Sequence, residues 1–583
     1  MFMTILSFSS VFGGFPNIAY GQASMACDVI VIINSASTDV QDFYRFVKPY
    51  LDQFGFPYTI LDISTTPVTA AALQRALIVA GHKNLDPTRS YLDTTEEGYI
   101  LAAVEQGTGL VNFGNADSTY QFVQEIFNFG YAGSVTGSSI KIVEGAGDRH
   151  YIISAQPIGN TISLKSSITL PNLSVPPSDQ ILVTAGTWPL LIATQYGQGR
   201  ALQWASYDWA SASKTGPVYG LDDLVWRGLV WAARKPFVMR GFPPFLTMRI
   251  DDSSGEGDFR WAEIASSHGI KPWIGLHLDN VRSDPDRVVA LKRLVDAGNA
   301  TTNVHSYDDS RYFYFNHPAS ADYDDATVAT HFADADNFFS TYQIAKAKYI
   351  LPHSYEFGTN VFGYLKNWGV EFIGTVYPVG QREDEGGWPI RLGPYRLYED
   401  LWDYLDPFYY GDWIPIANHP EFDHQFFNVL TEIRDNAGYE WFPDNDVQGS
   451  ISRGTAQTKR ALDSMVLATL FSHEQHVVKI SDSNWNAILT GILENLASYD
   501  LLLVTMDYAA QYARAMVTSR ASASSYEPST GLFAVTFTGY ADMTTKLYLF
   551  TDGASGITSQ LMDVPFFTNG YTFQFYLAGP NTA

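Results

Sequence analysis

The sequence contains a single cysteine, Cys27, among 583 residues. One thiol cannot form an intramolecular disulfide, and it cannot build a thiolate zinc cluster. Any metal ion must therefore be bound by histidine, aspartate or glutamate side chains.

Basic residues are also few, with 36 Lys and Arg against 61 Asp and Glu and a formal net charge of −25. Proteins bind a phosphate backbone through a basic surface, so this composition argues against nucleic acid as a partner. An acidic surface suits a neutral or cationic partner. The other explanation is that the acidic residues only keep the protein soluble. After the N-terminal segment no apolar run reaches the roughly 18 residues that a membrane span needs.

The N-terminus begins with an apolar stretch, Met3 to Phe15, followed by the small residues of segment 21–24. This order resembles a secretory signal with a cleavage site, although a basic n-region is missing. We expect residues 1–24 to be a signal peptide, and the mature protein to be extracellular or associated with the cell wall.

The length of the chain exceeds what one hydrophobic core supports and indicates three or four units. With 46% apolar and 17% charged residues, these units are expected to be globular. Aromatic residues make up 15% of the chain. Their rings pack in cores and also stack on sugars, so the excess fits either use.

The first unit is expected to be an open, doubly wound α/β sheet. Residues 28–33 read as a strand, with Asp28 followed by five apolar residues. A helical spacing of apolar residues and further strand-like runs at 58–63 and 109–113 come after it. The succession resembles glutamine-amidotransferase-like domains. Those enzymes carry a nucleophile after such a strand, but residues 114–117 read Gly-Asn-Ala-Asp. We therefore expect residues 26–236 to be a non-catalytic scaffold or carbohydrate-binding domain.

A proline-rich junction precedes a long stretch, residues 240–515, in which strand and helix patterns alternate. Such alternation is typical of a (β/α) barrel. Short strand patterns after a serine-rich linker indicate a small β-sandwich at residues 522–583. The predicted fold class is therefore α/β, with three successive domains.

The most informative segment is the strand 246–252, which ends in Asp251 and Asp252. Catalytic groups of a (β/α) barrel lie at the carboxyl ends of its strands. Two adjacent carboxylates there can divide metal binding and proton abstraction between them. The other interpretation is that the pair caps the following helix.

Histidines follow at later strand ends. His305 is a candidate metal ligand, and either Asp309, four residues on, or His317 is the candidate for the next ligand position. His473 is the candidate acid, because imidazole can protonate a leaving amine near neutral pH. The alternative interpretation is that His473 and His476 are two exposed histidines on a helix, without a catalytic role. Their spacing is one residue too short for the His-Glu-x-x-His motif of zinc peptidases.

The order of these segments resembles the polysaccharide deacetylase superfamily, and most closely the fungal galactosaminogalactan deacetylases, over about residues 240–515. The matching segments are Thr247 to Asp252, His305-Ser306 and Leu470 to His473. Asp309 stands where the family has a second histidine. The family's arginine before the proline strand end is also absent, and His353 is the candidate to orient the base in its place.

The resemblance implies removal of N-acetyl groups from an extracellular amino-sugar polysaccharide of the galactosaminogalactan type. Asp252 and His305, with Asp309 or His317, would hold a divalent metal ion, expected to be Zn²⁺. Asp251 would be the base and His473 the acid. The residues expected to contact the polymer are His353, Tyr355 and Trp413, with Trp273, Trp388, Tyr395 and Trp402 as further stacking candidates.

Two other functions stay open at this point. A glycoside hydrolase on a similar barrel would use paired carboxylates such as Asp251 and Glu356 without a metal ion. A polysaccharide-binding protein would have lost catalysis altogether. The sequence indicates no protein partner.

Overall fold

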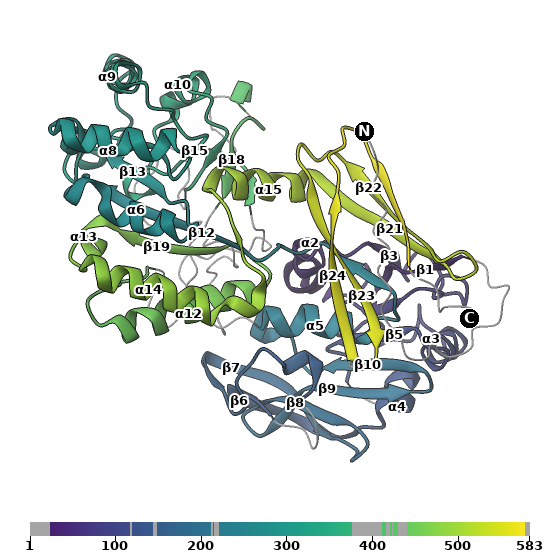
Figure 1. The fold of residues 1–583 in the computed structure, drawn as a ribbon. Helices are drawn as coiled ribbons and strands as arrows, with labels where there is room; N and C mark the ends of the chain where they lie inside the picture. The colour runs from purple at the N-terminus through teal and green to yellow at the C-terminus, as the bar shows by residue number, and fades with distance from the viewer. Residues whose placement is uncertain are drawn as a thin grey trace, which may run out of the picture.

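The computed structural model describes residues 24–116, 119–143, 149–211, 214, 221–375, 411–414, 420–422, 424–429, 440–554 and 556–577. The expected signal peptide up to residue 23 lies outside these ranges, as do the candidate rings of Trp388, Tyr395 and Trp402. The described residues form a mixed α/β fold with five sheets (Figure 1).

The N-terminal part is built on a nine-stranded sheet of order β3-β2-β4-β5-β10-β9-β8-β6-β7. The first five strands are parallel and the last four are antiparallel. Strand β2 (Val29–Ile33) is buried along its whole length, as its uninterrupted apolar sequence requires. The other strands are β3 (Tyr58–Asp62), β4 (Leu77–Ala80), β5 (Gly109–Phe113), β6 (Gly130–Ile142), β7 (Thr161–Ser174), β8 (Gln180–Ala185), β9 (Trp188–Tyr196) and β10 (Gly199–Trp204).

The parallel half agrees with the open α/β sheet expected from the sequence. Its principal helices are α2 (Lys48–Gln53), α3 (Thr94–Glu105), α4 (Gln121–Phe127) and α5 (Asp222–Ala232). Helix α3 begins with a capping box between Asp93 and Glu96, so its first turn is fixed by local sequence.

The central part contains a parallel sheet of order β14-β13-β12-β19, with β20 paired to β12. Its strands are β12 (Phe245–Ser253), β13 (Trp273–His277), β14 (Thr301–Ser306), β19 (Ala468–His473) and β20 (Leu502–Leu503). The helices around it are α6 (Arg260–Ser267), α8 (Pro285–Asp296), α12 (Val447–Asp463) and α14 (Asp482–Asn495) (Figure 1).

A second central sheet has the order β15-β16-β18-β17. Its strands are β15 (Tyr349–Ile350), β16 (Phe372–Ile373), β17 (Gly411–Trp413) and β18 (Phe427–Val429). Over the described residues no strand pairing joins this sheet to the first, so the closed (β/α) barrel expected from the sequence is not confirmed. Strands β15 and β16 are each two residues long. The neighbouring edges are linked instead by single contacts, such as Ala347 N donating to Thr302 O at 2.8 Å.

The C-terminal strands form two further sheets, of order β1-β21-β22-β25 and β11-β23-β24. Both sheets contribute side chains to one apolar core, in the region where the sequence predicts a small β-sandwich at residues 522–583. Its strands are β1 (Met25–Ala26), β11 (Phe237–Met239), β21 (Ser519–Glu527), β22 (Leu532–Gly539), β23 (Thr545–Gly553), β24 (Gly556–Val564) and β25 (Tyr571–Tyr576).

Two sandwich strands come from distant parts of the chain, because β1 pairs with β21 and β11 pairs with β23. Figure 1 shows the C-terminal strands beside the N-terminal part, where Arg200 forms an ion pair with Asp552 at 3.3 Å. The tail is therefore tied to the start of the chain. Among the described helices, none has both the length and the apolar character that a membrane crossing demands.

Candidate metal centre

The carboxyl ends of neighbouring parallel strands meet around Asp252. Strand β12 carries Asp251 and Asp252 directly before its last residue, Ser253. Strands β13 and β19 end at His277 and His473, and His305 is the next-to-last residue of β14. Asp251 lies directly opposite His473 in the β12–β19 register. Because parallel strands place their carboxyl ends at one edge, side chains up to 222 positions apart in the sequence come together there.

Strand β12 bends at this edge through a β-bulge. Its register against β13 shifts between Ile250 and Ser253, and Asp252 has a left-handed φ of 51°. A bulge inserts one extra residue and redirects a side chain that would otherwise alternate across the sheet. A left-handed backbone costs a non-glycine residue about 1–2 kcal/mol. The surrounding contacts must stabilise this conformation, as is common at functional sites.

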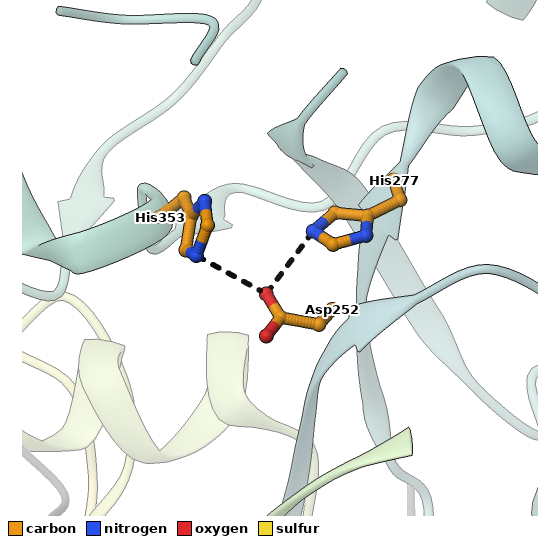
Figure 2. Close-up of side chains that lie close together, drawn as sticks. All are labelled: Asp252, His277 and His353. Atoms are coloured by element: carbon orange, nitrogen blue, oxygen red, sulfur yellow. Dashed lines mark ion pairs between the residues drawn. The ribbon is translucent and has the colours of Figure 1, made fainter. Parts of the chain in front are cut away.

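The Asp252 carboxylate faces four imidazole rings. His277 Nε2 and His305 Nε2 each lie 3.1 Å from Oδ1, and His353 Nε2 lies 3.8 Å from the same oxygen. His473 Nε2 lies 3.6 Å from Oδ2. Figure 2 shows the His277 and His353 rings pointing at the carboxylate from separate elements.

This environment determines the charge of Asp252. Burial alone would raise the pKa of Asp252, but the contacts with His277 and His305 hold it well below its usual range. The carboxylate is therefore ionised at neutral pH and supplies a fixed negative charge to the centre.

The geometry fits a bound divalent cation. Asp252, His277 and His353 each offer one ligand atom, and these atoms lie within 4.8 Å of one another. Two ligands of a tetrahedral zinc ion, each about 2.0 Å from it, are separated by roughly 3.3 Å. Asp252 Oδ1 and His277 Nε2 are 3.1 Å apart, yet both are buried without a well-aligned hydrogen bond. Such a pair is better explained as two ligands of one ion than as a donor and its acceptor.

The ligand nitrogens are held with their lone pairs available. His305 Nδ1 donates to Leu351 O at 2.7 Å, which fixes the tautomer and leaves Nε2 free for the centre. Burial, reinforced by the neighbouring His305, lowers the pKa of His353 to about 3. His353 is therefore neutral at physiological pH, the form in which imidazole binds metal ions.

Asp251 is buried beside a buried arginine on the same strand. Arg249 Nε lies 3.1 Å from Asp251 Oδ1, and the two side chains are 0% and 3% exposed. Residues two apart on a strand share a face, so this pairing follows from the extended backbone. Burial raises the pKa of the Asp251 carboxyl, and the Arg249 charge opposes that rise.

Arg249 is itself fixed by aromatic side chains. Its guanidinium lies 3.7 Å from the centre of the Phe471 ring and donates to the Tyr355 hydroxyl at 3.1 Å. From the sequence, His353 was the candidate to orient the base. In the structure the ion-pair partner of Asp251 is Arg249, while His353 faces Asp252.

His473 has a carboxylate partner on its other nitrogen. Nδ1 lies 2.6 Å from Glu440 Oε1, so the ring donates there and presents Nε2 to the centre. Burial would lower the pKa of His473, but the Glu440 hydrogen bond and the charges of Asp251 and Asp252 raise it to about 9. The ring is therefore protonated near neutral pH.

The two candidates for the third ligand lie elsewhere. The Asp309 side chain is 86% exposed and lies 3.8 Å from His277 Nδ1, the nitrogen directed away from Asp252. His317 Nδ1 bonds the buried carboxylate of Glu356 at 2.9 Å. His277 occupies the position for which the sequence offered Asp309 or His317.

The residues expected to contact the substrate have partners within the protein. Tyr355 bonds Arg249, and Trp413 on β17 contacts the rings of His424 and Phe427. Trp273 is fully buried and donates to Tyr349 O at 3.1 Å, so it is a core residue and cannot stack on a polymer. The Tyr312 ring, which the sequence did not single out, stacks on both His317 and His353 with centroid distances of 4.6 Å.

His277 is the site residue that sequence reasoning missed. It ends the buried strand β13, the next strand along the chain after the Asp-Asp strand. The sequence did contain a signal for His277, because this polar residue directly follows a buried apolar run. Polar residues at strand ends are typical of site residues in this architecture. The apolar pattern alone ended the strand one residue earlier.

Comparison with known proteins gives no family assignment, since no family model and no curated protein matches the chain. Solved structures match at low similarity. A Mycobacterium smegmatis protein named as a candidate polysaccharide deacetylase is 9% identical, with 47% of this chain and 91% of that chain covered and a TM-score of 0.30. A cytoplasmic protein of Salmonella typhimurium LT2 is 18% identical over 31% of this chain and 87% of that one, with a TM-score of 0.24.

A β-galactosidase from Bacillus circulans sp. alkalophilus is 10% identical over 31% of this chain and 29% of that chain, with a TM-score of 0.22. These TM-scores are too low to establish a shared fold. The interpretation of the site therefore depends on its own geometry.

The ligand set is tested by comparing His277→Ala with His317→Ala. Loss of His277 removes a nitrogen 3.1 Å from the central carboxylate, so zinc affinity should fall by about 100-fold or more. Loss of His317 breaks a contact with Glu356 and should leave zinc affinity within about threefold of the parent. Equilibrium dialysis with metal analysis measures both. The opposite ranking of the two variants would contradict this ligand set.

Proposed function

We propose that this chain is a metal-dependent deacetylase that removes N-acetyl groups from an extracellular amino-sugar polysaccharide. The observation that carries the proposal is the arrangement around Asp252. The side chains of Asp252, His277 and His353 could hold a cation. Beside them lie the Asp251 carboxylate, which pairs with Arg249, and the His473 imidazole, which pairs with Glu440. Amide hydrolysis needs these three functions: an electrophilic centre, a base and an acid.

Asp252 and His277, with His305 and His353, would hold the cation, for which we propose Zn²⁺ because the donor set is imidazole nitrogen and carboxylate oxygen. When bound, a zinc ion supplies Lewis acidity, which polarises a carbonyl and acidifies water. The protein's own contribution is to orient these four donors.

Asp251 is the proposed base. It is buried next to the cluster and accepts the proton of the attacking water, while the Arg249 charge stabilises its ionised form between turnovers. Arg249 also limits the side chain to one orientation, because its guanidinium is held by Phe471 and Tyr355. We assign Arg249 as a positioning residue for Asp251.

His473 is the proposed acid. Its Nε2 faces the centre across from Asp251, and its Nδ1 is bonded to Glu440. A protonated ring in this position can transfer the Nε2 proton to the departing amine as the amide C–N bond breaks. Glu440 then stabilises the ring orientation through the Nδ1 hydrogen bond, as a carboxylate partner does for other catalytic histidines.

The substrate class rests on the order of motifs along residues 240–515, which resembles the polysaccharide deacetylases. The net charge of −25 is compatible with it, because a deacetylated amino-sugar polymer is cationic. Secretion follows from the same proposal, since such polymers lie outside the cell.

The glycoside hydrolase alternative requires a second carboxyl group free to protonate a glycosidic oxygen. The Glu356 side chain is fully buried and lies 2.9 Å from His317 Nδ1. This pairing gives Glu356 a structural role between two loops. The geometry therefore favours the deacetylase.

An acetate assay tests the proposed function on α-1,4-linked N-acetylgalactosamine oligomers, chitin oligomers and acetylated xylan. We expect acetate release from the N-acetylated oligomers without new reducing ends, loss of activity with a chelator, and recovery with zinc. Asp251→Asn should lower the rate about 10²–10⁴-fold, because it removes the general base. Asp258→Asn, an exposed residue with a left-handed φ that asparagine tolerates, is the matched control.

Two outcomes of that assay would contradict the proposal. Chain cleavage that resists the chelator would indicate a glycoside hydrolase. Oligomer binding without acetate release under any metal condition would indicate a non-catalytic binding protein.

The positioning role of Arg249 is tested by a double-mutant cycle. Arg249→Met should lower kcat about 10–100-fold by releasing Asp251. If Arg249 acts through Asp251, the double variant Arg249→Met with Asp251→Asn should be no slower than Asp251→Asn alone, within about threefold. It should also unfold at a higher temperature than Arg249→Met, because no buried carboxylate is left unpaired. Additive losses in kcat would refute a role through Asp251.

A further inference from the structure

A second group of potential ligands lies on the far side of the His473 ring. Glu440, His473 and His476 each present one donor atom, and the three atoms lie within 4.8 Å of one another. His473 Nδ1 is 2.6 Å and His476 Nε2 is 3.6 Å from the same oxygen, Glu440 Oε1. The His476 separation is close to the roughly 3.3 Å expected between two ligands of one tetrahedral ion, and the 2.6 Å contact is a hydrogen bond whose proton a cation would replace.

Local structure brings the three residues together. His473 is the N-cap of helix α13 (Glu474–Val477) and His476 is three residues later, so both rings lie on one side of a single turn. Glu440 is fixed from another segment, since the next residue, Trp441, donates from its backbone N to Phe471 O at 2.9 Å. The group is therefore held by β19, by α13 and by the segment around Glu440, and it shares His473 with the Asp252 centre.

The second group is open to solvent on one side. The His473 and His476 side chains are 23% and 27% exposed, whereas Glu440 is 9% exposed. The half-exposed ring of Phe442 stands edge-on against His476 at 5.0 Å. Two partly exposed imidazole rings thus lie beside a largely buried carboxylate.

We propose that Glu440, His473 and His476 form a second divalent-cation site, whose occupation inhibits the enzyme. His473 is shared by the two centres, because its Nε2 lies 3.6 Å from Asp252 Oδ2 while its Nδ1 faces Glu440. A cation bound at Nδ1 releases the proton of that nitrogen to solvent. That cation replaces the Glu440–His473 hydrogen bond that orients the ring, so Nε2 is no longer held toward the Asp252 centre.

The inhibition part of this inference rests on the proposed function, but the binding part does not. Excess zinc should lower the acetate-release rate of the parent protein without displacing the ion at Asp252. The binding of the second ion can be measured on the resting protein, whatever its substrate.

The experiment measures zinc stoichiometry by equilibrium dialysis of the full chain as free zinc is raised. We expect two equivalents for the parent, the second binding more weakly, and one equivalent for His476→Asn. His268→Asn is the matched control, because His268 contacts Asn486 at the surface and should leave both equivalents in place. A parent protein that saturates at one equivalent, or a His476→Asn variant that still binds two, would overturn the second site.

A second arm separates this failure from failure of the proposed function. In the acetate assay, high zinc should inhibit the parent and the His268→Asn control at least about tenfold more than His476→Asn. Equal inhibition of all three proteins would overturn the inhibitory role. If no acetate is released at all, the proposed function fails, and the stoichiometry still decides whether the second site exists.

Discussion

The architecture of the centre depends on one buried anion, the carboxylate of Asp252. Removing an ionised carboxylate from water is costly unless other groups compensate for the lost hydration. Here the compensation comes from four imidazoles carried by four different strand ends or the turns after them. The β-bulge and the left-handed backbone of Asp252 direct that carboxylate toward those rings.

The same edge of the sheet is also stabilised by hydrogen bonds to the Glu474 carboxylate. Glu474, next to His473, accepts hydrogen bonds from Ser254 N at 2.6 Å, from Gly255 N at 2.9 Å and from Trp261 Nε1 at 3.0 Å. This carboxylate ties the turn after β12 to the start of α13. The proposed base and the proposed acid are therefore held on adjacent strands by backbone pairing and by a common anchor.

Much of the centre could be predicted because its residues close buried apolar runs. Asp251, Asp252, His305 and His473 follow recognisable strands, and the shared edge of parallel strands then brings them together. His277 was missed because strand boundaries are uncertain by a few residues. Arg249 could not be found, since a charged residue inside a strand gives no sign of its buried partner.

For the fold, the parallel N-terminal strands could be predicted from their continuous apolar sequences. The pairing of β1 and β11 with the C-terminal strands could not, because it is a long-range contact without a local signal.

The central claim is that Asp252 and the surrounding imidazoles bind one cation. Anomalous diffraction at the zinc edge from crystals of the zinc-loaded protein tests it most directly. We expect an anomalous peak about 2.0–2.2 Å from Asp252 Oδ1 and His277 Nε2. Zinc found only at other sites, or an Asp252 carboxylate separated from the histidine rings in the refined coordinates, would contradict it.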